Sequence, residues 1–153
     1  MTTDGSEGSV STLRDQNHPY CVVCGQSNGH GLGLDVRVTA PGVVEAMFHC
    51  NSQFEGYPGM LHGGMTCALL DGAMTNCLFA HECVAVTVEL NVRFRNPVAV
   101  GRTVAIKAWI ESSLPPLYVL AGEIRQDGEL MATATGKFME KSMMSVWTAR
   151  NRP

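Results

Sequence analysis

The sequence has 153 residues, of which 45% are hydrophobic and 16% charged, and its formal net charge is −3. This length fits a single domain with one core, and a net negative charge gives no support for nucleic-acid binding. No segment approaches the roughly 20 apolar residues of a membrane span, and the N-terminus lacks the basic start of a secretory signal. We therefore expect a cytoplasmic protein whose six cysteines are thiols.

Residues 1–20 are small and polar without apolar periodicity, and we expect them to form a flexible arm. Residues 21–30 are rich in turn signals and predict a loop. Alternating apolar and polar residues predict strands over 32–38 and 43–49, and Pro41-Gly42 fits a hairpin turn between them.

One long helix is predicted over residues 63–80. It is apolar on most faces, so it must be covered nearly all round, and the rest of the chain offers only strands to cover it. Four strands follow, of which the last two are joined by an Asp-Gly turn, over 86–94, 103–111, 117–125 and 129–139. This order predicts an α+β fold in which a curved antiparallel sheet of five to six strands wraps one central helix. The domain is expected over 21–140, with a C-terminal tail over 141–153.

Asp71 is the one charged residue between Gly63 and Ala80. Burying a carboxylate costs several kcal/mol unless partners compensate. Asp71 is therefore a functional acid, or it is a helix residue that points at solvent through a gap or at a subunit contact. Thr75 lies one turn later on the same face, where it can reach the carboxylate or its water, with a structural role as the alternative.

His62-Gly63-Gly64 stands where the helix begins. A helix start offers unpaired N–H groups and the positive end of the helix dipole, and glycine lets a ligand approach closely. Such a site suits a carbonyl oxygen that gains negative charge during attack. The alternative is an ordinary turn in which His62 packs against or caps the helix.

Gly63 and Asp71 are about 12 Å apart along the helix axis. A scissile carbonyl must lie about 3 Å from its oxyanion donor and also near the attacking group. One chain cannot meet both demands, whereas two antiparallel helices at a two-fold interface can. The chemistry therefore predicts a homodimer with two shared sites, and pairing of two such dimers into a homotetramer is left open.

The segment FEGYPGMLHGG at residues 54–64, together with the acid at Asp71, resembles the hotdog-fold acyl-CoA thioesterases of the phenylacetate-pathway (PaaI-like) branch. The resemblance covers roughly residues 20–140. It implies a hotdog fold and a thioesterase that hydrolyses a small, medium-chain or aromatic acyl-CoA. We expect no cofactor and no metal.

This resemblance assigns roles to individual residues. Gly63 matches the glycine whose N–H polarises the thioester carbonyl, and Asp71 matches the acid that attacks the carbonyl or activates water. His62 matches a residue near the thioester, Thr75 a hydroxyl one turn beyond the acid, and Thr87 a serine or threonine near the site. The other residues expected at the substrate are Tyr57, Met60, Gly64 and Met74.

Two positions depart from the family pattern. Many members carry Asn or Gln where this chain has Gly56, for which Glu55 or Asn51 could substitute, and many close relatives carry Glu where this chain has Gly72. Both departures leave open a non-catalytic acyl-CoA-binding or regulatory module. A hotdog dehydratase acting on 3-hydroxyacyl thioesters is a second alternative, with His49 before the loop that precedes the helix.

Cys21-x2-Cys24, with His18 and His30 nearby, is compatible with half or all of a zinc site. Since the sequence has no second clear pair of zinc ligands, we favour a loop without metal that packs near the mouth of the substrate pocket. Three arginines are candidates for contacts with coenzyme A phosphates, with solvated strand ends as the alternative: Arg93, Arg95 and Arg102.

Overall fold

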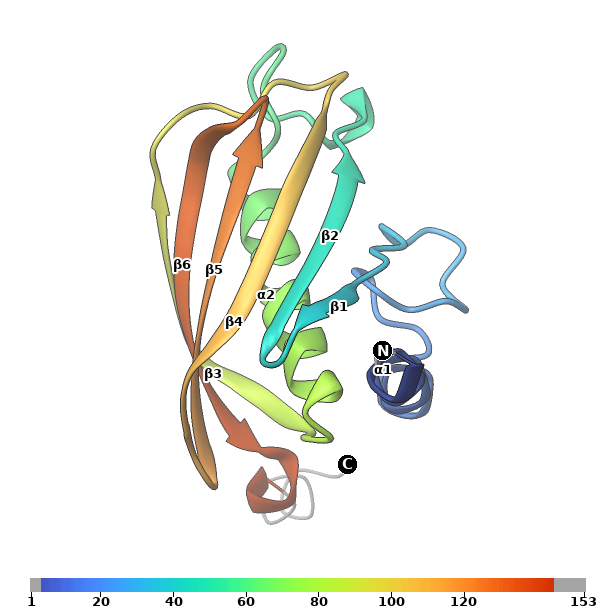
Figure 1. Ribbon diagram of the computed structural model, residues 1–153. Coiled ribbons are helices and arrows are strands. Elements are labelled where there is room, and N and C mark those ends of the chain that lie inside the picture. Colours follow the sequence, from blue (N-terminus) through green and yellow to red (C-terminus); the bar gives the residue numbers. More distant parts are fainter. Residues whose placement is uncertain (1–3, 145–153) are drawn as a thin grey trace, which may run out of the picture.

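A six-stranded antiparallel sheet curves around the long helix α2 (Gly63–Ala80), with strand order β1-β2-β4-β5-β6-β3 (Figure 1). The computed structural model describes residues 4–144. The strands are β1 (Arg37–Ala40), β2 (Val43–His49), β3 (Ala85–Phe94), β4 (Thr103–Leu114), β5 (Leu117–Gln126) and β6 (Glu129–Glu140). The described residues also form helix α1 (Asp4–Asn17) and two short 3-10 helices, η1 (Ser52–Phe54) and η2 (Lys141–Met144). The predicted arrangement of one helix wrapped by a curved sheet is confirmed.

Glycines on the inner face of the sheet let α2 approach it closely. A Cβ at Gly122 in β5 would lie 3.2 Å from Cδ2 of Leu70, and a Cβ at Gly136 in β6 would lie 3.3 Å from Sδ of Met74. Leu70 and Met74 are fully buried. A side chain at either glycine would push the helix away from the sheet, so these positions set the thickness of the core.

Both predicted hairpin turns are confirmed. Gly42, between β1 and β2, has φ of 72°, a conformation that glycine adopts without a steric penalty. Asp127 and Gly128, between β5 and β6, have φ of 52° and 84°, as a two-residue type I′ turn requires.

The N-terminal segment departs from the expected flexible arm, because residues Asp4–Asn17 form helix α1, which packs on α2. Its inward face carries few apolar residues. Val10 and Arg14 are buried, and Leu13 and Asn17 are half-buried. These positions have the i, i+3, i+4, i+7 spacing of one helix face, but only two of the four are apolar. The sequence therefore shows little of the apolar periodicity that signals a helix.

The first strand is also shorter than predicted, since β1 begins at Arg37 and not at Leu32. The N–H groups of Leu32 and Leu34 donate instead to the carbonyls of Val22 and Val23, at 2.7 and 2.9 Å. The apolar alternation over this stretch thus reflects pairing with the preceding loop. The loop and α1 lie beside α2, so the expectation that strands alone cover the helix is wrong (Figure 1).

Strand β3 is an edge of the sheet. It pairs with β6 on one side, with an irregularity between Thr87 and Glu89, and its other side is unpaired among the described residues. Three of its apolar side chains are exposed: Val86, Val88 and Phe94. An exposed apolar edge strand is typical of a strand that pairs with another chain.

The predicted C-terminal tail is described only as far as η2, and residues 145–153 lie outside the described residues. No helix within residues 4–144 is long and apolar enough to cross a membrane.

Candidate active site

A cavity of about 700 Å³ opens at the N-terminal end of α2. One wall consists of the segment before α2 and its first turn, including Tyr57, Met60, His62 and Gly63. The other wall consists of the end of β3 and the following residues 94–98, with Met131 and Ala132 from β6. Its walls are mostly apolar and its volume is typical of a pocket for a small molecule.

The first turn of α2 leaves one backbone N–H directed at no protein group. His62 is the N-cap, and its Nδ1 accepts a hydrogen bond from the N–H of Gly64 at 2.9 Å. The N–H groups of Met65 and Thr66 donate to the carbonyl of His62 at 2.9 and 3.3 Å. Among the described residues, the Gly63 N–H has no hydrogen-bond partner, and Gly63 lines the cavity. The N-terminus of α2 therefore presents one free donor to the cavity, beside the positive end of the helix dipole.

His62 also serves as one wall of the cavity. Because its Nδ1 accepts from Gly64, the ring proton of the neutral imidazole lies on Nε2. A Cβ at Gly56 would lie 3.2 Å from Cα of His62, so the absence of a side chain at Gly56 lets the two segments pack together. The capping role that the sequence offered as an alternative for His62 is thus present.

Asp71 lies near the middle of α2 and is half-buried. Its Oδ1 accepts a hydrogen bond of 2.7 Å from Oγ1 of Thr87 in β3. This bond fixes one carboxylate oxygen, and it links the helix to the edge strand. The pair lies outside the cavity lining of its own chain.

The structure divides the expected site residues into two groups. His62, Gly63, Tyr57 and Met60 line the cavity, whereas Gly64 lies next to it with its N–H engaged by His62. Three others lie further along α2 and outside the cavity lining: Asp71, Thr75 and Met74. Thr75 is buried, and Met74 is fully buried in the core against Gly136. Thr87 joins the second group through Asp71.

Several lining residues were missed as site residues by the sequence analysis. They end β3, follow it or belong to β6: Phe94, Asn96, Pro97, Val98, Met131 and Ala132. Met131 accepts backbone hydrogen bonds from Arg95 and Asn96, at 2.8 and 3.1 Å, which holds this wall together. The Asn-Pro pair at the end of a predicted strand is a turn signal beside the helix start, but it carries no chemical signature of a site.

The two departures from the family pattern have local structural causes. Glu55 accepts from the Gly59 N–H at 3.1 Å and Asn51 caps η1, so each suggested substitute for the missing amide at Gly56 is engaged in loop structure. A Cβ at Gly72 would lie 2.4 Å from Cγ1 of Val23 in the N-terminal loop. The loop therefore occupies the space that a side chain at position 72 would need.

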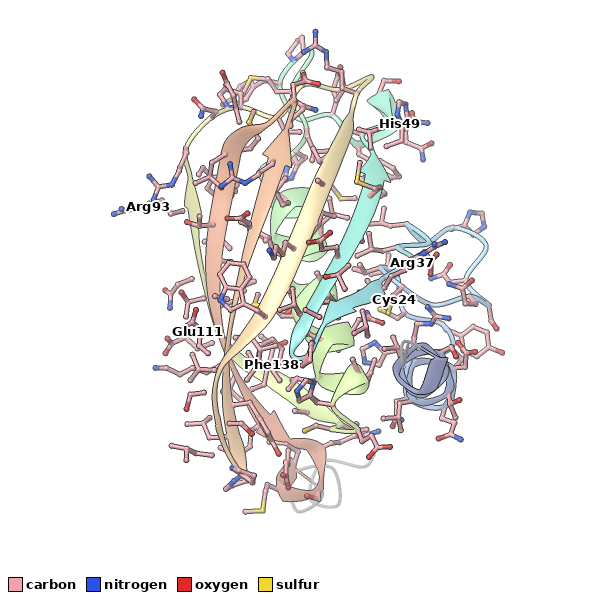
Figure 2. The ribbon with its side chains drawn as sticks, viewed as in Figure 1. Cys24, Arg37, His49, Arg93, Glu111 and Phe138 are labelled. Carbon is pink, nitrogen blue, oxygen red and sulfur yellow. The ribbon has the colours of Figure 1, made fainter. Side chains whose placement is uncertain are left out.

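The three candidate arginines lie in different places. Arg95 lines the cavity. Arg102 donates to Oδ2 of Asp127 at 2.8 Å in an exposed ion pair, and Arg93 extends away from the edge strand (Figure 2). Of the three, Arg95 is the one positioned for a ligand in the cavity.

His49, which was considered for a dehydratase, is the C-terminal residue of β2 and is not part of the cavity lining (Figure 2). Its exposed ring lies 3.5 Å from Oγ1 of Thr103.

A second group of chemically competent side chains lies in the N-terminal loop. The ligand atoms of His18, Cys21 and Cys24 all lie within 4.8 Å of one another. Burial raises the pKa of the Cys24 thiol to about 11. Burial, followed by the positive charge of Lys141, lowers the pKa of His18, while Asp71 acts in the opposite direction. These residues are separate from the cavity.

Comparison with known proteins shows which proteins this chain resembles. The profile of the thioesterase superfamily matches residues 58–131, which include the helix start, Asp71 and β3. The chain is 28% identical over 96 residues to acyl-coenzyme A thioesterase THEM4 of Bos taurus, covering 61% of this chain and 39% of that protein. The chain thus spans about two fifths of the length of this relative.

Solved structures share the whole fold. The PaaI protein of E. coli, from the phenylacetic acid degradation operon, superposes with a TM-score of 0.75 at 18% identity, covering 91% of this chain and 96% of that one. A phenylacetic acid degradation-related protein of Ralstonia eutropha JMP134 gives a TM-score of 0.71 at 27% identity, with 86% and 98% covered. The chain therefore has the hotdog fold, and its residues 58–131 are similar to the thioesterase superfamily.

Proposed function

We propose that this protein is an acyl-CoA thioesterase that hydrolyses a small, medium-chain or aromatic acyl-CoA in a site shared by two protomers. The observation that carries the proposal is the partnerless N–H of Gly63, which opens into a mostly apolar cavity of about 700 Å³. The similarity to an acyl-coenzyme A thioesterase supports the choice of thioester.

In this proposal the acyl group lies in the cavity and its carbonyl oxygen accepts a hydrogen bond from Gly63. The negative charge that develops on this oxygen during attack is stabilised by the N–H and by the helix dipole. Asp71 of the second protomer either attacks the carbonyl carbon or removes a proton from an attacking water. In both routes water and the thioester yield a carboxylic acid and the free thiol of coenzyme A.

The open edge of β3 supports the homodimer. Pairing of β3 with its copy across a two-fold axis would bury Val86 and Val88, and it would place the two α2 helices side by side. Asp71 is tied to that same strand through Thr87, so it would lie close to the interface. The helix start of one protomer would then face the Asp71 of the other.

Arg95 supports the assignment of coenzyme A as the leaving group. It lines an otherwise mostly apolar cavity, where a guanidinium suits phosphate recognition by its fork of N–H donors. The acyl group would then lie deeper, between Tyr57, Met60 and Met131.

Replacement of Gly63 by proline tests the proposed oxyanion donor directly. Gly63 is the first helical residue, where proline is well tolerated, and His62 before it has φ −59° and ψ 133°, which suits a residue that precedes proline. Gly63→Pro should therefore fold while it lacks the N–H, and kcat should fall by about 100- to 1,000-fold. Gly63→Ala keeps the N–H and is the matched control, because its Cβ would lie 3.5 Å from Phe94 in ordinary contact.

The measurement is release of coenzyme A from a panel of short, medium-chain and aromatic acyl-CoAs, with Asp71→Asn as a second test variant. Turnover that survives in Gly63→Ala and is lost in Gly63→Pro and Asp71→Asn would support the shared site. Saturable binding of acyl-CoA without turnover by the unmodified protein would favour the non-catalytic binding module. Full activity of a folded Gly63→Pro variant would show that the N–H of Gly63 is not the oxyanion donor.

A further inference from the structure

We propose that His18, Cys21 and Cys24 bind one zinc ion, which fastens the N-terminal segment to the outer face of α2. His18 and the two cysteines belong to the loop between α1 and β1, and Figure 2 shows Cys24 in this region. Within residues 4–144, this is the cluster of His, Cys, Asp or Glu side chains whose geometry could hold a metal ion. It is distinct from the cavity at the start of α2.

The separations of the ligand atoms fit a tetrahedral ion. Zinc lies at about 2.3 Å from sulfur and about 2.0 Å from imidazole nitrogen, so a tetrahedral site places sulfur and nitrogen roughly 3.6 Å apart. Sγ of Cys24 lies 3.8 Å from Nδ1 of His18. All three ligand atoms are within 4.8 Å of one another, so shifts of about 1 Å complete the geometry.

The loop backbone is already shaped around Cys21. The N–H of Val23 points at Sγ of Cys21 at 3.4 Å, and the N–H of Gly25 donates to the Cys21 carbonyl at 2.9 Å. A Cβ at Gly25 would lie 2.4 Å from the Cys21 nitrogen, so the turn requires glycine. These contacts hold the Cys21 sulfur in one position within the loop.

Asn76 provides independent evidence for a ligand at this place. It is fully buried on α2, and its side-chain amide lies close enough to Cys24 to lower the pKa of that thiol against the larger effect of burial. Its Nδ2 donates to the Gly72 carbonyl at 2.8 Å, whereas Oδ1 is the buried side-chain polar atom without a partner among the described residues. A buried oxygen without a partner costs about 1–3 kcal/mol. We assign the fourth position of the metal to Oδ1 of Asn76, directly or through one water.

The chemistry of the donors and their charges favours zinc. Two thiolates and one imidazole are the soft and borderline ligands that select Zn²⁺ over Mg²⁺ or Ca²⁺. Two thiolates and Zn²⁺ form a neutral unit, which suits a site where Cys24 is fully buried and where Arg14, Lys141 and Asp71 supply the nearby charges. Because Cys24 and Asn76 are both inaccessible, the ion would serve a structural role.

The test is to measure the metal content and the cobalt spectrum of the full-length protein. We expect one equivalent of zinc per chain after purification without chelator. After removal of zinc, Co²⁺ should give the visible absorption of a tetrahedral centre and the near-ultraviolet charge-transfer band of thiolate ligation. The cobalt experiment needs no substitution, so it remains informative if a variant fails to fold.

Cys21→Ser should weaken zinc binding by more than about 100-fold, since it removes a direct ligand. Cys67→Ser is the matched control, because Cys67 is also a half-buried cysteine but lies outside the cluster, and it should bind zinc as the unmodified protein does. The proposal would be overturned if reduced protein bound neither Zn²⁺ nor Co²⁺ with thiolate ligation. A Cys21–Cys24 disulfide whose reduction restores no metal binding would overturn it equally.

Discussion

At the scale of single residues, the hydrogen bond from Thr87 to Asp71 makes the edge strand part of the proposed chemistry. This bond fixes one oxygen of the carboxylate at 2.7 Å and leaves the other available. Thr87→Val removes the donor while it keeps the shape of the side chain, and we expect kcat to fall by about 10- to 100-fold, as the loss of a hydrogen bond to a charged group implies. Thr87→Ser keeps the donor and should retain most of the activity.

The measurement is kcat and KM for both variants on the best substrate of the panel, with thermal unfolding as the check on the fold. A Thr87→Val variant with unchanged kcat would mean that the orientation of Asp71 does not depend on this bond.

Asp71 and Gly63 could be singled out from the sequence because each is unusual where it stands, one as a lone charge on an apolar helix and the other as a glycine at a helix start. Met74 and Thr75 share the same helix but are buried, as their apolar or neutral character also allows. The far wall of the cavity could not be predicted, because Phe94 and Met131 are brought together by strand pairing between β3 and β6. Sequence patterns within one element do not report such a contact.

At the scale of the elements, the contact between Gly72 in α2 and Val23 in the N-terminal loop makes a clear prediction. Gly72→Ala would place a Cβ 2.4 Å from Cγ1 of Val23, so it should lower the free energy of unfolding by about 1–3 kcal/mol despite the better helix propensity of alanine. Adding Val23→Ala should recover part of this loss, because it removes the clashing methyl groups.

Chemical denaturation of both single variants and the double variant gives the coupling free energy between the two positions. Additive effects would show that the loop does not rest on Gly72 in solution.

The helix over 63–80 was predicted with its observed bounds, because it is a long apolar run with a glycine start and no internal proline. Helix α1 was not predicted, because its inward face carries two apolar residues, Val10 and Leu13, and is completed by Arg14 and Asn17. Such a helix is stabilised by its contact with α2 more than by its own pattern. The shortened β1 has a similar cause, since a loop took the hydrogen bonds that a strand would have used.

At the scale of the whole molecule, a shared site predicts complementation between two inactive variants. A protomer with Asp71→Asn keeps its Gly63 donor, and a protomer with Gly63→Pro keeps its acid. In a random mixture half of the dimers contain one of each, and each of these has one intact site of two. Mixing should therefore restore about a quarter of the unmodified activity.

Coexpression of the two variants, followed by the coenzyme A release assay, measures this recovery. Sedimentation confirms that the mixture is dimeric. A dimeric mixture as inactive as its components would place both groups in one chain, or place the chemistry elsewhere.

The N-terminal segment has a consequence for higher assembly. Val23 meets Gly72, the amide of Asn76 reaches Cys24, and the ring of His18 meets Phe79 at 5.1 Å between centroids. Gly72, Asn76 and Phe79 follow the i, i+4, i+7 spacing of one stripe along α2. The N-terminal segment of the same chain therefore covers this stripe, so two copies of the proposed dimer cannot pack against each other through it. If the proposed dimer pairs again into a tetramer, the tetramer must be built through other surfaces, because the N-terminal segment blocks this side of α2.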